Sequence, residues 1–463
     1  MTDTSQKHYF LVGIGGIGMQ ALVDVMLGMG YKITGSDIAD FPAKSRLEAK
    51  GVKVLIGPQV SENVPADIDG LIYSSVIKRH FPGLDHPEVL KAKELNVPIY
   101  KRSEFIGKLA ESKIGIAVSG THGKTTTSVL ITAILQAANL EPSALIGAEV
   151  KNIKGCGVYG AGEHLVIEAC EYDRSFLDMK PKIAVLTNIE ADHLDYYKDL
   201  TEIKAAFKQF IELVPANGLI VACGDDKNVL DILDSSKAKV VTFGFNENND
   251  LRATNLNISN EKMTFKVGDM DITMNFPGKH LVLDALAAIA VAKHLNIDDK
   301  YIKQALLQFD GASRRFDVLG TKQDITFVDD YAHHPTEIKA MLESAKAYFK
   351  DRFIRVVFQP HQFSRTRFLL NDFANSFESA NEVLVAPILP VRDTEADKQS
   401  ISTADLVNKI NEVSSNAKEM PSFEAITEYL NQNIKANDVI LSMGAGKNSD
   451  WIHKYYDEFK KAI

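Results

Sequence analysis

The sequence predicts an α/β protein of three domains, from its length, its composition and a pattern that recurs along it. Its 463 residues exceed the ~250–300 that one hydrophobic core usually fills, and 45% of them are hydrophobic, enough for several cores. Three times, an apolar strand-like run leads into a polar or glycine-rich turn and then into alternating helices and strands. We expect a Rossmann-like N-terminal domain over 1–112, a P-loop central domain over 113–313 and a Rossmann-like C-terminal domain over 314–463.

The first apolar run, 8–13, leads into the glycine-rich turn GIGGIG over 13–18. Apolar residues at helical spacing follow, and a second strand over 32–37 ends in Asp37. Glycines in such a turn let the backbone approach a phosphorylated ligand, and an acid after the second strand suits a ribose hydroxyl. Many nucleotide-binding folds use this motif, so alone it also fits a nicotinamide-dependent dehydrogenase. The remaining expected elements are strands at 70–74 and 97–100 and a helix at 104–111.

The central domain is predicted to open with a buried strand over 114–119 that runs into GTHGKTTT, residues 120–127, and a helix from 128. Such a turn points backbone N–H groups and the positive end of a helix at an anion. Lys124 is expected to reach phosphates, and the Thr125 hydroxyl to bind Mg²⁺. Val118 stands where a standard Walker A motif has its first glycine. The alternative is a glycine-rich turn in an ATP-independent α/β protein.

Polar residues follow the next two strands that we expect, at 164–168 and 183–187. Glu168 and His193 lie at or after these strand ends, where ligands of parallel sheets bind. A carboxylate and an imidazole beside a phosphate loop are suited to hold Mg²⁺. For Glu171 and Asp195 the alternative is a helix cap or a surface acid. The other expected elements are a strand at 219–223, a small antiparallel patch within 250–276 and a helix at 281–295.

The third domain is predicted to be a parallel α/β sheet with ligand-binding residues after two of its strands. Asp329 to Pro335 (DDYAHHP) follows the first of them. Adjacent side chains point in different directions, so the two histidines are not expected to share a metal, and we expect this cluster to close over a nucleotide or an acyl group. Arg365 and Arg367 follow a later strand and supply cations for a carboxylate or phosphate, although a solvated helix face also fits Arg367. The strands are expected at 325–328, 355–358, 382–386 and 439–442, and helices at 336–349 and 403–413.

Charge and cysteine content narrow the class of protein. The formal net charge of −9 argues against general binding to nucleic acid or anionic membranes, which favour a basic face. Three cysteines are too few and too scattered for a disulfide framework or a cysteine-rich metal site. The polar stretch 1–7 does not resemble a signal peptide, and no apolar run reaches the ~18–20 residues that span a bilayer. We therefore expect a cytoplasmic protein.

Taken together, the motifs resemble one family over the whole chain, the Mur ligases, which form amide bonds with ATP in peptidoglycan and cell-wall precursor synthesis. The motifs that carry the resemblance, in chain order, are GIGGIGM, SSVIK, GTHGKTTT, EACEYDRSFL, TNIEADHLDYY, RRF, DDYAHHPTE and QPHQFSRT. The resemblance implies that the three domains bind, in order, a UDP-sugar, ATP and an amino acid. It further implies that L-alanine is joined to the lactyl carboxylate of UDP-N-acetylmuramate through an acyl phosphate, by a monomer or homodimer.

The resemblance also implies roles for individual residues. The residues expected to bind the UDP-sugar are Gly13, Gly15, Gly16, Gly18, Asp37, Ser74 and Ser75. The residues expected to bind ATP are Gly120, Thr121, His122, Gly123, Lys124, Thr125, Thr126, Arg315 and Asp330. Thr125, Glu168 and His193 are expected to hold Mg²⁺. The catalytic residues are expected to be Lys124, His193, His333 and Arg365, with His333 and Arg365 facing the amino acid.

The sequence departs from the family pattern at four places. Leu281 and Asp284 replace two asparagines, one of which is associated with adenine recognition, and Gln362 replaces an arginine near the amino-acid carboxylate. GAGKN replaces GAGD near the C-terminus, and Phe207 stands where several relatives carry a carbamylated lysine, so we expect no such modification here. The alternatives are a recycling ligase that joins a tripeptide to the same UDP-sugar, a dehydrogenase that uses the N-terminal glycines, and a P-loop binding protein without ligase chemistry.

Overall fold

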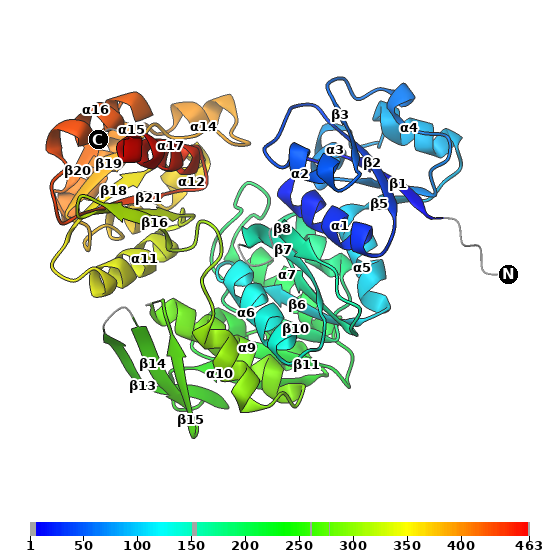
Figure 1. Cartoon of the computed structure of the whole chain (residues 1–463), viewed down its shortest axis with the longest axis horizontal. Coiled ribbons are helices and arrows are strands. Elements are labelled where there is room, and N and C mark those ends of the chain that lie inside the picture. The colour runs from blue at the N-terminus through cyan, green and yellow to red at the C-terminus, as the bar shows by residue number, and fades with distance from the viewer. Residues whose placement is uncertain (1–5, 151–154, 260–261, 277, 462–463) are drawn as a thin grey trace. The chain divides into compact units, whose positions relative to one another are not determined.

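A computed structural model describes residues 6–150, 155–259, 262–276 and 278–461 (Figure 1). The chain divides into two compact units. The first contains Met1–Ile189, Ile203–Arg252 and Ala285–Ala305, and the second Glu190–Glu202, Ala253–Asp284 and Leu306–Ile463. The two units are described separately below. Residues 1–5 of the polar N-terminal stretch lie outside the described residues.

The first unit begins with a five-stranded parallel sheet in the order β3-β2-β1-β4-β5. This order reverses direction on the two sides of β1, as in Rossmann-type domains, and it confirms the Rossmann-like expectation. The strands are β1 (His8–Val12), β2 (Lys32–Asp37), β3 (Lys53–Ile56), β4 (Gly70–Tyr73) and β5 (Ile99–Lys101). The helices are α1 (Ile17–Gly28), α2 (Lys44–Ala49), α3 (Ser75–His80), α4 (Pro87–Glu94) and α5 (Arg102–Glu111), with a 3₁₀ turn η1 (Ser61–Asn63).

A second sheet of the first unit carries the phosphate-loop sequence. Its strands follow the order β12-β11-β10-β6-β9-β7-β8, so the strand before the loop lies between β10 and β9. Strands β7, β8 and β12 were not predicted from the sequence. Strand β8 pairs antiparallel with β7, so this sheet has an antiparallel edge where only parallel strands were expected. The strands are β6 (Ile114–Ser119), β7 (Ser143–Val150), β8 (Gly155–Val158), β9 (His164–Glu168), β10 (Ile183–Leu186), β11 (Leu219–Cys223) and β12 (Lys239–Gly244).

Helices and 3₁₀ turns connect these strands. The helix after the phosphate loop begins at Lys124, not at 128 as predicted, which places Lys124 and Thr125 in its first turn. Phe207, the residue at the family's lysine position, is buried and lies against Phe176 with ring centroids 5.2 Å apart. The helices and turns are α6 (Lys124–Ala137), η3 (Tyr172–Asp178), α7 (Leu200–Glu212), α8 (Lys227–Leu230), η4 (Leu233–Ser235), α9 (Lys279–His294) and α10 (Asp299–Leu307).

The predicted antiparallel patch is confirmed. Strands β13 (Leu251–Ser259), β14 (Lys262–Val267) and β15 (Met270–Met274) pair antiparallel in sequence order (Figure 1). Alternation of buried and more exposed residues along β14 and β15 explains why this segment forms strands with one covered face.

The second unit also holds a six-stranded sheet, in the order β16-β17-β21-β18-β19-β20. The four predicted strands, β17, β18, β19 and β21, are parallel, and β20, which was not predicted, joins them in parallel. Strand β16, also not predicted, pairs antiparallel with β17, which corrects the expectation of a purely parallel sheet. The strands are β16 (Asp317–Lys322), β17 (Ile325–Asp330), β18 (Phe353–Phe358), β19 (Glu382–Val385), β20 (Ala417–Glu419) and β21 (Asp438–Met443). The helices are α11 (Pro335–Tyr348), α12 (Phe363–Phe368), α13 (Leu370–Ala374), α14 (Glu395–Gln399), α15 (Thr403–Val413), α16 (Phe423–Asn433) and α17 (Asn448–Lys461).

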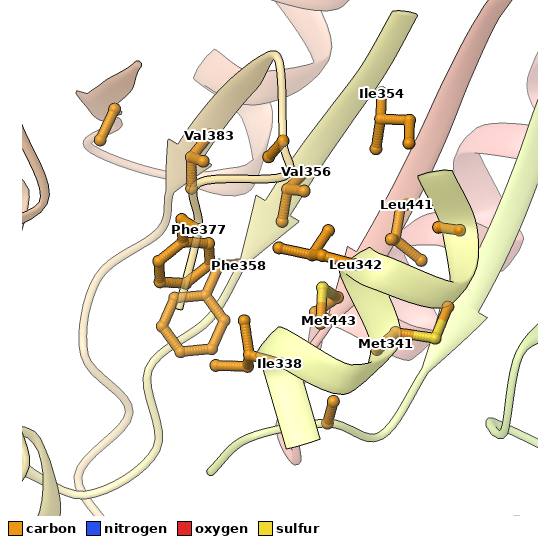
Figure 2. Close-up of a cluster of buried hydrophobic side chains, with 14 of the residues drawn as sticks. Ile338, Met341, Leu342, Ile354, Val356, Phe358, Phe377, Val383, Leu441 and Met443 are labelled. Carbon is orange, nitrogen blue, oxygen red and sulfur yellow. The ribbon is translucent and has the colours of Figure 1, made fainter. Parts of the chain in front are cut away.

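Hydrophobic side chains cover both faces of this sheet, because successive residues of a strand point to opposite faces. Ile354, Val356 and Phe358 of β18 pack with α11 on one face, as Figure 2 shows. Val357 of the same strand belongs to a separate cluster on the other face, with Tyr455 of α17. A core on each face holds the carboxyl ends of β17 and β18 in place, and the predicted site residues follow those ends. Among the described residues, no helix has both the length and the apolar content needed to cross a membrane.

Candidate functional site

The phosphate loop of the first unit has the backbone of an anion-binding turn. Gly120 and Gly123 have φ angles of +143° and +81°, which favour glycine. A Cβ atom on Gly120 would lie 2.0 Å from the Thr187 Oγ1 atom, so no larger residue fits there. No side chain caps the first turn of α6, and no acid lies in it. The N–H groups of that turn therefore remain suited to an anionic ligand.

The end of β10 supports the loop from its other side. The Asn188 side-chain oxygen accepts a hydrogen bond from the His122 backbone N–H at 2.8 Å, and Thr187 Oγ1 donates to the His122 carbonyl at 2.5 Å. The Thr121 N–H donates to the Asn188 carbonyl at 3.1 Å. These bonds fix the predicted loop residues Thr121 and His122, and they arise because β10 neighbours β6.

The Lys124 side chain folds back onto the carbonyl groups of the phosphate loop. Its Nζ atom donates to the Gly120 carbonyl at 2.5 Å and the Thr121 carbonyl at 3.0 Å, and lies 3.0 Å from Glu171 Oε2. Burial by itself would lower the pKa of Lys124, but the negative charge of Glu171, with smaller contributions from Cys170 and Glu168, raises it above the usual value. Lys124 is therefore a fixed cation, and Glu171, for which a cap or surface position was the alternative, is its buried counterion.

Thr125 and Glu168, two of the predicted Mg²⁺ ligands, meet in the structure. The Thr125 hydroxyl donates to Glu168 Oε2 at 2.9 Å, and the Gly147 N–H donates to the same oxygen at 2.7 Å. A hydroxyl and a carboxylate side by side offer the hard oxygen ligands that Mg²⁺ prefers, so these residues fit the ion. His193, the third predicted ligand, belongs to the second unit, and its place in the set stays a prediction.

The N-terminal glycine turn is closely packed on the predicted residues around it. The Gly15 N–H donates to Asp37 Oδ2 at 2.8 Å, so Asp37 fixes the turn directly. Gly13 has a φ of +78°, and a Cβ on it would lie 3.1 Å from the Cβ of Ser74, the residue that precedes α3. Ser75 begins α3, and Gly16 precedes α1 without a side-chain cap. The predicted UDP-sugar residues thus surround two uncapped helix starts.

In the second unit, Asp330 positions the arginine pair of the RRF motif. Its carboxylate accepts hydrogen bonds from the backbone N–H groups of Phe316 and Ala332, each at 2.7 Å. Burial raises the pKa of Asp330 to about 6, although Arg315 and these two hydrogen bonds act in the opposite direction. Arg315 lies over the Tyr331 ring and 3.7 Å from Glu337. The structure therefore shows Asp330 holding the turn that carries Arg315.

The two adjacent histidines point to different partners, as expected. His334 caps α11, with its Nδ1 atom accepting from the Thr336 N–H at 3.4 Å. His333 Nδ1 lies 3.0 Å from the Tyr331 carbonyl and 3.3 Å from Glu337. A carbonyl can only accept, so this contact places the proton on Nδ1 and leaves a lone pair on Nε2. Burial lowers the pKa of His333 to about 3, despite Glu337, so the ring is neutral.

Arg365 pairs with Asp192, an acid that was given no role from the sequence. Its Nη2 and Nε atoms lie 2.8 and 3.1 Å from Asp192 Oδ1, and its Nη1 lies 3.1 Å from His361 Nδ1. Burial alone would raise the pKa of Asp192, but Arg365 and nearby histidines hold it well below the usual range. Asp192, His193, Arg365 and Gln362 line one small pocket, and the Gln362 Nε2 atom is buried with no hydrogen-bond partner among the described residues.

Sequence reasoning missed several residues that complete these sites. Asp192 adjoins His193 in the motif, and this adjacency was the one signal for it in the sequence. Glu337 and His361 lie inside quoted motifs but were given no role. Arg367, by contrast, is 44% exposed and 3.6 Å from Asp397, in agreement with the surface alternative. None of the three cysteines is in a disulfide, and burial raises the pKa of Cys170 to about 12, so that its thiol stays protonated.

Three domain models of one protein family match most of the chain. "Mur ligase family, catalytic domain" matches residues 8–114, "Mur ligase middle domain" matches 118–292, and "Mur ligase, glutamate ligase domain" matches 314–446.

Individual relatives match nearly the full length. The UDP-N-acetylmuramate–L-alanine ligase of Clostridium kluyveri is 41% identical over 95% of this chain and 96% of its own. The ligase of the same name from Caldanaerobacter subterraneus subsp. tengcongensis is 40% identical over 98% of both chains. The crystal structure of UDP-N-acetylmuramate-alanine ligase from Thermotoga maritima has a TM-score of 0.81 at 27% identity, covering 99% of this chain and 100% of its own. With this identity over nearly its whole length, the chain belongs to the Mur ligase family.

Proposed function

We propose that this enzyme joins L-alanine to the lactyl carboxylate of UDP-N-acetylmuramate at the expense of ATP, with Mg²⁺, through an acyl phosphate. The observation that carries the proposal is the fixed cation Lys124 inside an uncapped helix-start loop, beside the Thr125–Glu168 pair. Relatives of the same length that are 40% and 41% identical carry the name UDP-N-acetylmuramate–L-alanine ligase. In this proposal each expected domain binds one ligand: residues 1–112 bind the UDP-sugar, 113–313 bind ATP and 314–463 bind the amino acid.

In this proposal ATP lies over the first turn of α6. The backbone of Gly120, Gly123 and Thr126, with Thr121 and His122, surrounds its phosphates, and Lys124 contacts their oxygens. Because Lys124 already donates to two loop carbonyls, the ligand meets a cation whose position is set before binding. Arg315, carried on the turn that Asp330 holds, supplies a further positive charge.

Thr125, Glu168 and His193 would hold Mg²⁺, which supplies charge neutralisation on the phosphate oxygens. The protein's contribution is the orientation of the ligands. The Gly147 N–H holds Glu168 Oε2 next to the Thr125 hydroxyl, and the backbone of His193 adopts a φ of +54°.

The carboxylate of the acceptor sugar receives the terminal phosphoryl group: a carboxylate oxygen bonds to phosphorus as the bond to the leaving ADP oxygen breaks. The amine of L-alanine then attacks the acyl carbon, and phosphate leaves. The lone pair on His333 Nε2 is available to accept a hydrogen bond from this amine, because Nδ1 carries the ring proton. Arg365 remains the cation for the amino-acid carboxylate, with Asp192 fixing its guanidinium plane.

The test is phosphate release by the purified enzyme. Release should require both UDP-N-acetylmuramate and an amino acid, with L-alanine faster than serine or glycine. Lys124→Ala should lower the rate on the order of 100-fold or more while UDP-N-acetylmuramate binding survives. Lys108→Ala, which removes an exposed cation of α5, should leave the rate unchanged. A rate that is indifferent to the UDP-sugar, reduction of NAD, or a preference for a tripeptide over L-alanine would each contradict the proposal.

A further inference from the structure

Arg102 places a cation against the N-terminal glycine turn. It is the first residue of α5, and its guanidinium lies on Gly18 in the first turn of α1. A Cβ on Gly18 would lie 3.0 Å from Arg102 Cζ and Nη1, so the absence of a side chain at residue 18 lets the guanidinium lie against the backbone of α1. The start of α1 has no side-chain cap and no acid in its first turn. A guanidinium and the positive end of a helix therefore face the same space.

Two neighbouring cations of the first unit have acidic partners. Lys101 Nζ lies 2.7 Å from Asp173, and Lys124 Nζ lies 3.0 Å from Glu171. Arg102 differs: across the described residues it has no hydrogen bond and no ion pair within 4.0 Å.

Burial lowers the pKa of Arg102, and the nearby Cys170 and Glu168 offset only part of this effect. A partly buried cation without a partner costs folding free energy and is normally paired or held by a ligand. Within the part of the chain that the structure describes, Arg102 is thus a partly buried cation without a hydrogen-bonded or ion-paired partner.

We propose that Arg102 binds an oxyanion of the sugar-nucleotide substrate, a contact that rests on the proposed function. Its planar fork matches two oxygens of one anion. The guanidinium lies against Gly18 of the glycine turn and interacts electrostatically with Glu168 at the end of β9. Two groups of UDP-N-acetylmuramate share this chemistry, the diphosphate and the lactyl carboxylate. UDP-N-acetylglucosamine separates them, because it keeps the diphosphate and lacks the carboxylate.

The experiment is titration calorimetry of the full-length enzyme with each sugar nucleotide and with ADP. The variants are Arg102→Met, which keeps the apolar stem, Arg102→Lys, which keeps the charge without the fork, and the control Lys108→Met on the same helix. Arg102→Met should weaken UDP-N-acetylmuramate binding on the order of 10- to 100-fold, as expected for one charged hydrogen-bonding group. Arg102→Lys should fall between wild type and Arg102→Met, and ADP binding should not change.

The loss for UDP-N-acetylglucosamine identifies the anion. An equal loss for both sugar nucleotides assigns Arg102 to the diphosphate, and a loss confined to UDP-N-acetylmuramate assigns it to the carboxylate. Thermal unfolding of the free proteins excludes a structural role: without a partner to lose, Arg102→Met should unfold at the wild-type temperature or above it.

Two results would overturn the assignment: wild-type affinity of Arg102→Met for both sugar nucleotides, or a lowered unfolding temperature of free Arg102→Met together with weakened ADP binding. A wild-type enzyme that binds ADP but no UDP-N-acetylmuramate would be a different failure, that of the proposed function on which this contact rests.

Discussion

Replacement of Glu171 by glutamine tests the central feature of the phosphate loop, a largely buried lysine paired with a buried carboxylate. Glu171 Oε2 and Oε1 lie 3.0 and 3.3 Å from Lys124 Nζ, and the two side chains are 4% and 13% exposed. The variant keeps the size of the side chain and an oxygen acceptor, but it removes the counter-charge. Lys124 then keeps the two loop carbonyls as hydrogen-bond partners but loses its paired anion, and Glu168 remains as a weaker negative charge nearby.

The size of the effect follows from this geometry. At 3.0 Å the gross attraction is about 5–6 kcal/mol for an effective dielectric constant of about 20, and breaking a buried pair costs about 3–5 kcal/mol. Glutamine still accepts a hydrogen bond, so we expect the lower end, about 3 kcal/mol. At roughly 2–4 °C per kcal/mol, the transition of the first unit should move down by about 6–12 °C.

Bound nucleotide, in contrast, should stabilise the Glu171→Gln variant more than it stabilises the wild type. In the wild type a phosphate shares Lys124 with Glu171, whereas in Glu171→Gln the phosphate is the only anion in direct contact with the lysine. A non-hydrolysable ATP analogue should therefore raise the unfolding temperature of the variant by more than that of the wild type. Differential scanning calorimetry with and without the analogue measures both effects.

The control is Glu247→Gln, which removes an exposed acid of the same unit. It should change neither the unfolding temperature nor the response to the analogue. An unfolding temperature of Glu171→Gln equal to that of the wild type, or an equal shift with the analogue, would refute the reasoning from the buried pair.

Three further predictions concern other parts of the chain. Gly15→Ala places a Cβ 2.8 Å from Asp37 Oδ2, so affinity for UDP-N-acetylmuramate should fall about tenfold while that for ADP holds, as calorimetry can check. Arg355→Met leaves Asp438 buried without its 2.9 Å partner and should cost about 3–5 kcal/mol in urea unfolding, with unchanged ADP affinity. The pKa of His333, about 3 in the folded protein, lies below the ordinary value. The contribution of this histidine to the free energy of unfolding is therefore fully present above pH ~6.5 and is lost as the pH falls towards 3. At pH 5 this loss amounts to about 2 kcal/mol. Between pH 7 and pH 5, the free energy of unfolding measured in urea should therefore fall by about that much less in His333→Gln than in the wild type.

The sequence by itself determined the regular elements whose pattern is local. The bounds predicted for β2, β6, β11 and α15 are those of the structure, because continuous apolar runs and helical spacing are properties of neighbouring residues. The sequence also predicted which glycines the turns require. At Gly120 and Gly13 the positive φ and the close approach of another residue explain why the motif needs glycine there.

Only the tertiary structure decided which residues meet. Strands β8 and β16 run antiparallel at sheet edges, and nothing in their own sequences distinguishes an antiparallel edge from a parallel one. Arg365 and Asp192 are 173 positions apart, so their pairing depends on how two chain segments pack. The same holds for the pair of Lys124 and Glu171. Local spacing sets element type over a few residues, whereas charge partners and burial are set by packing between residues far apart in the chain.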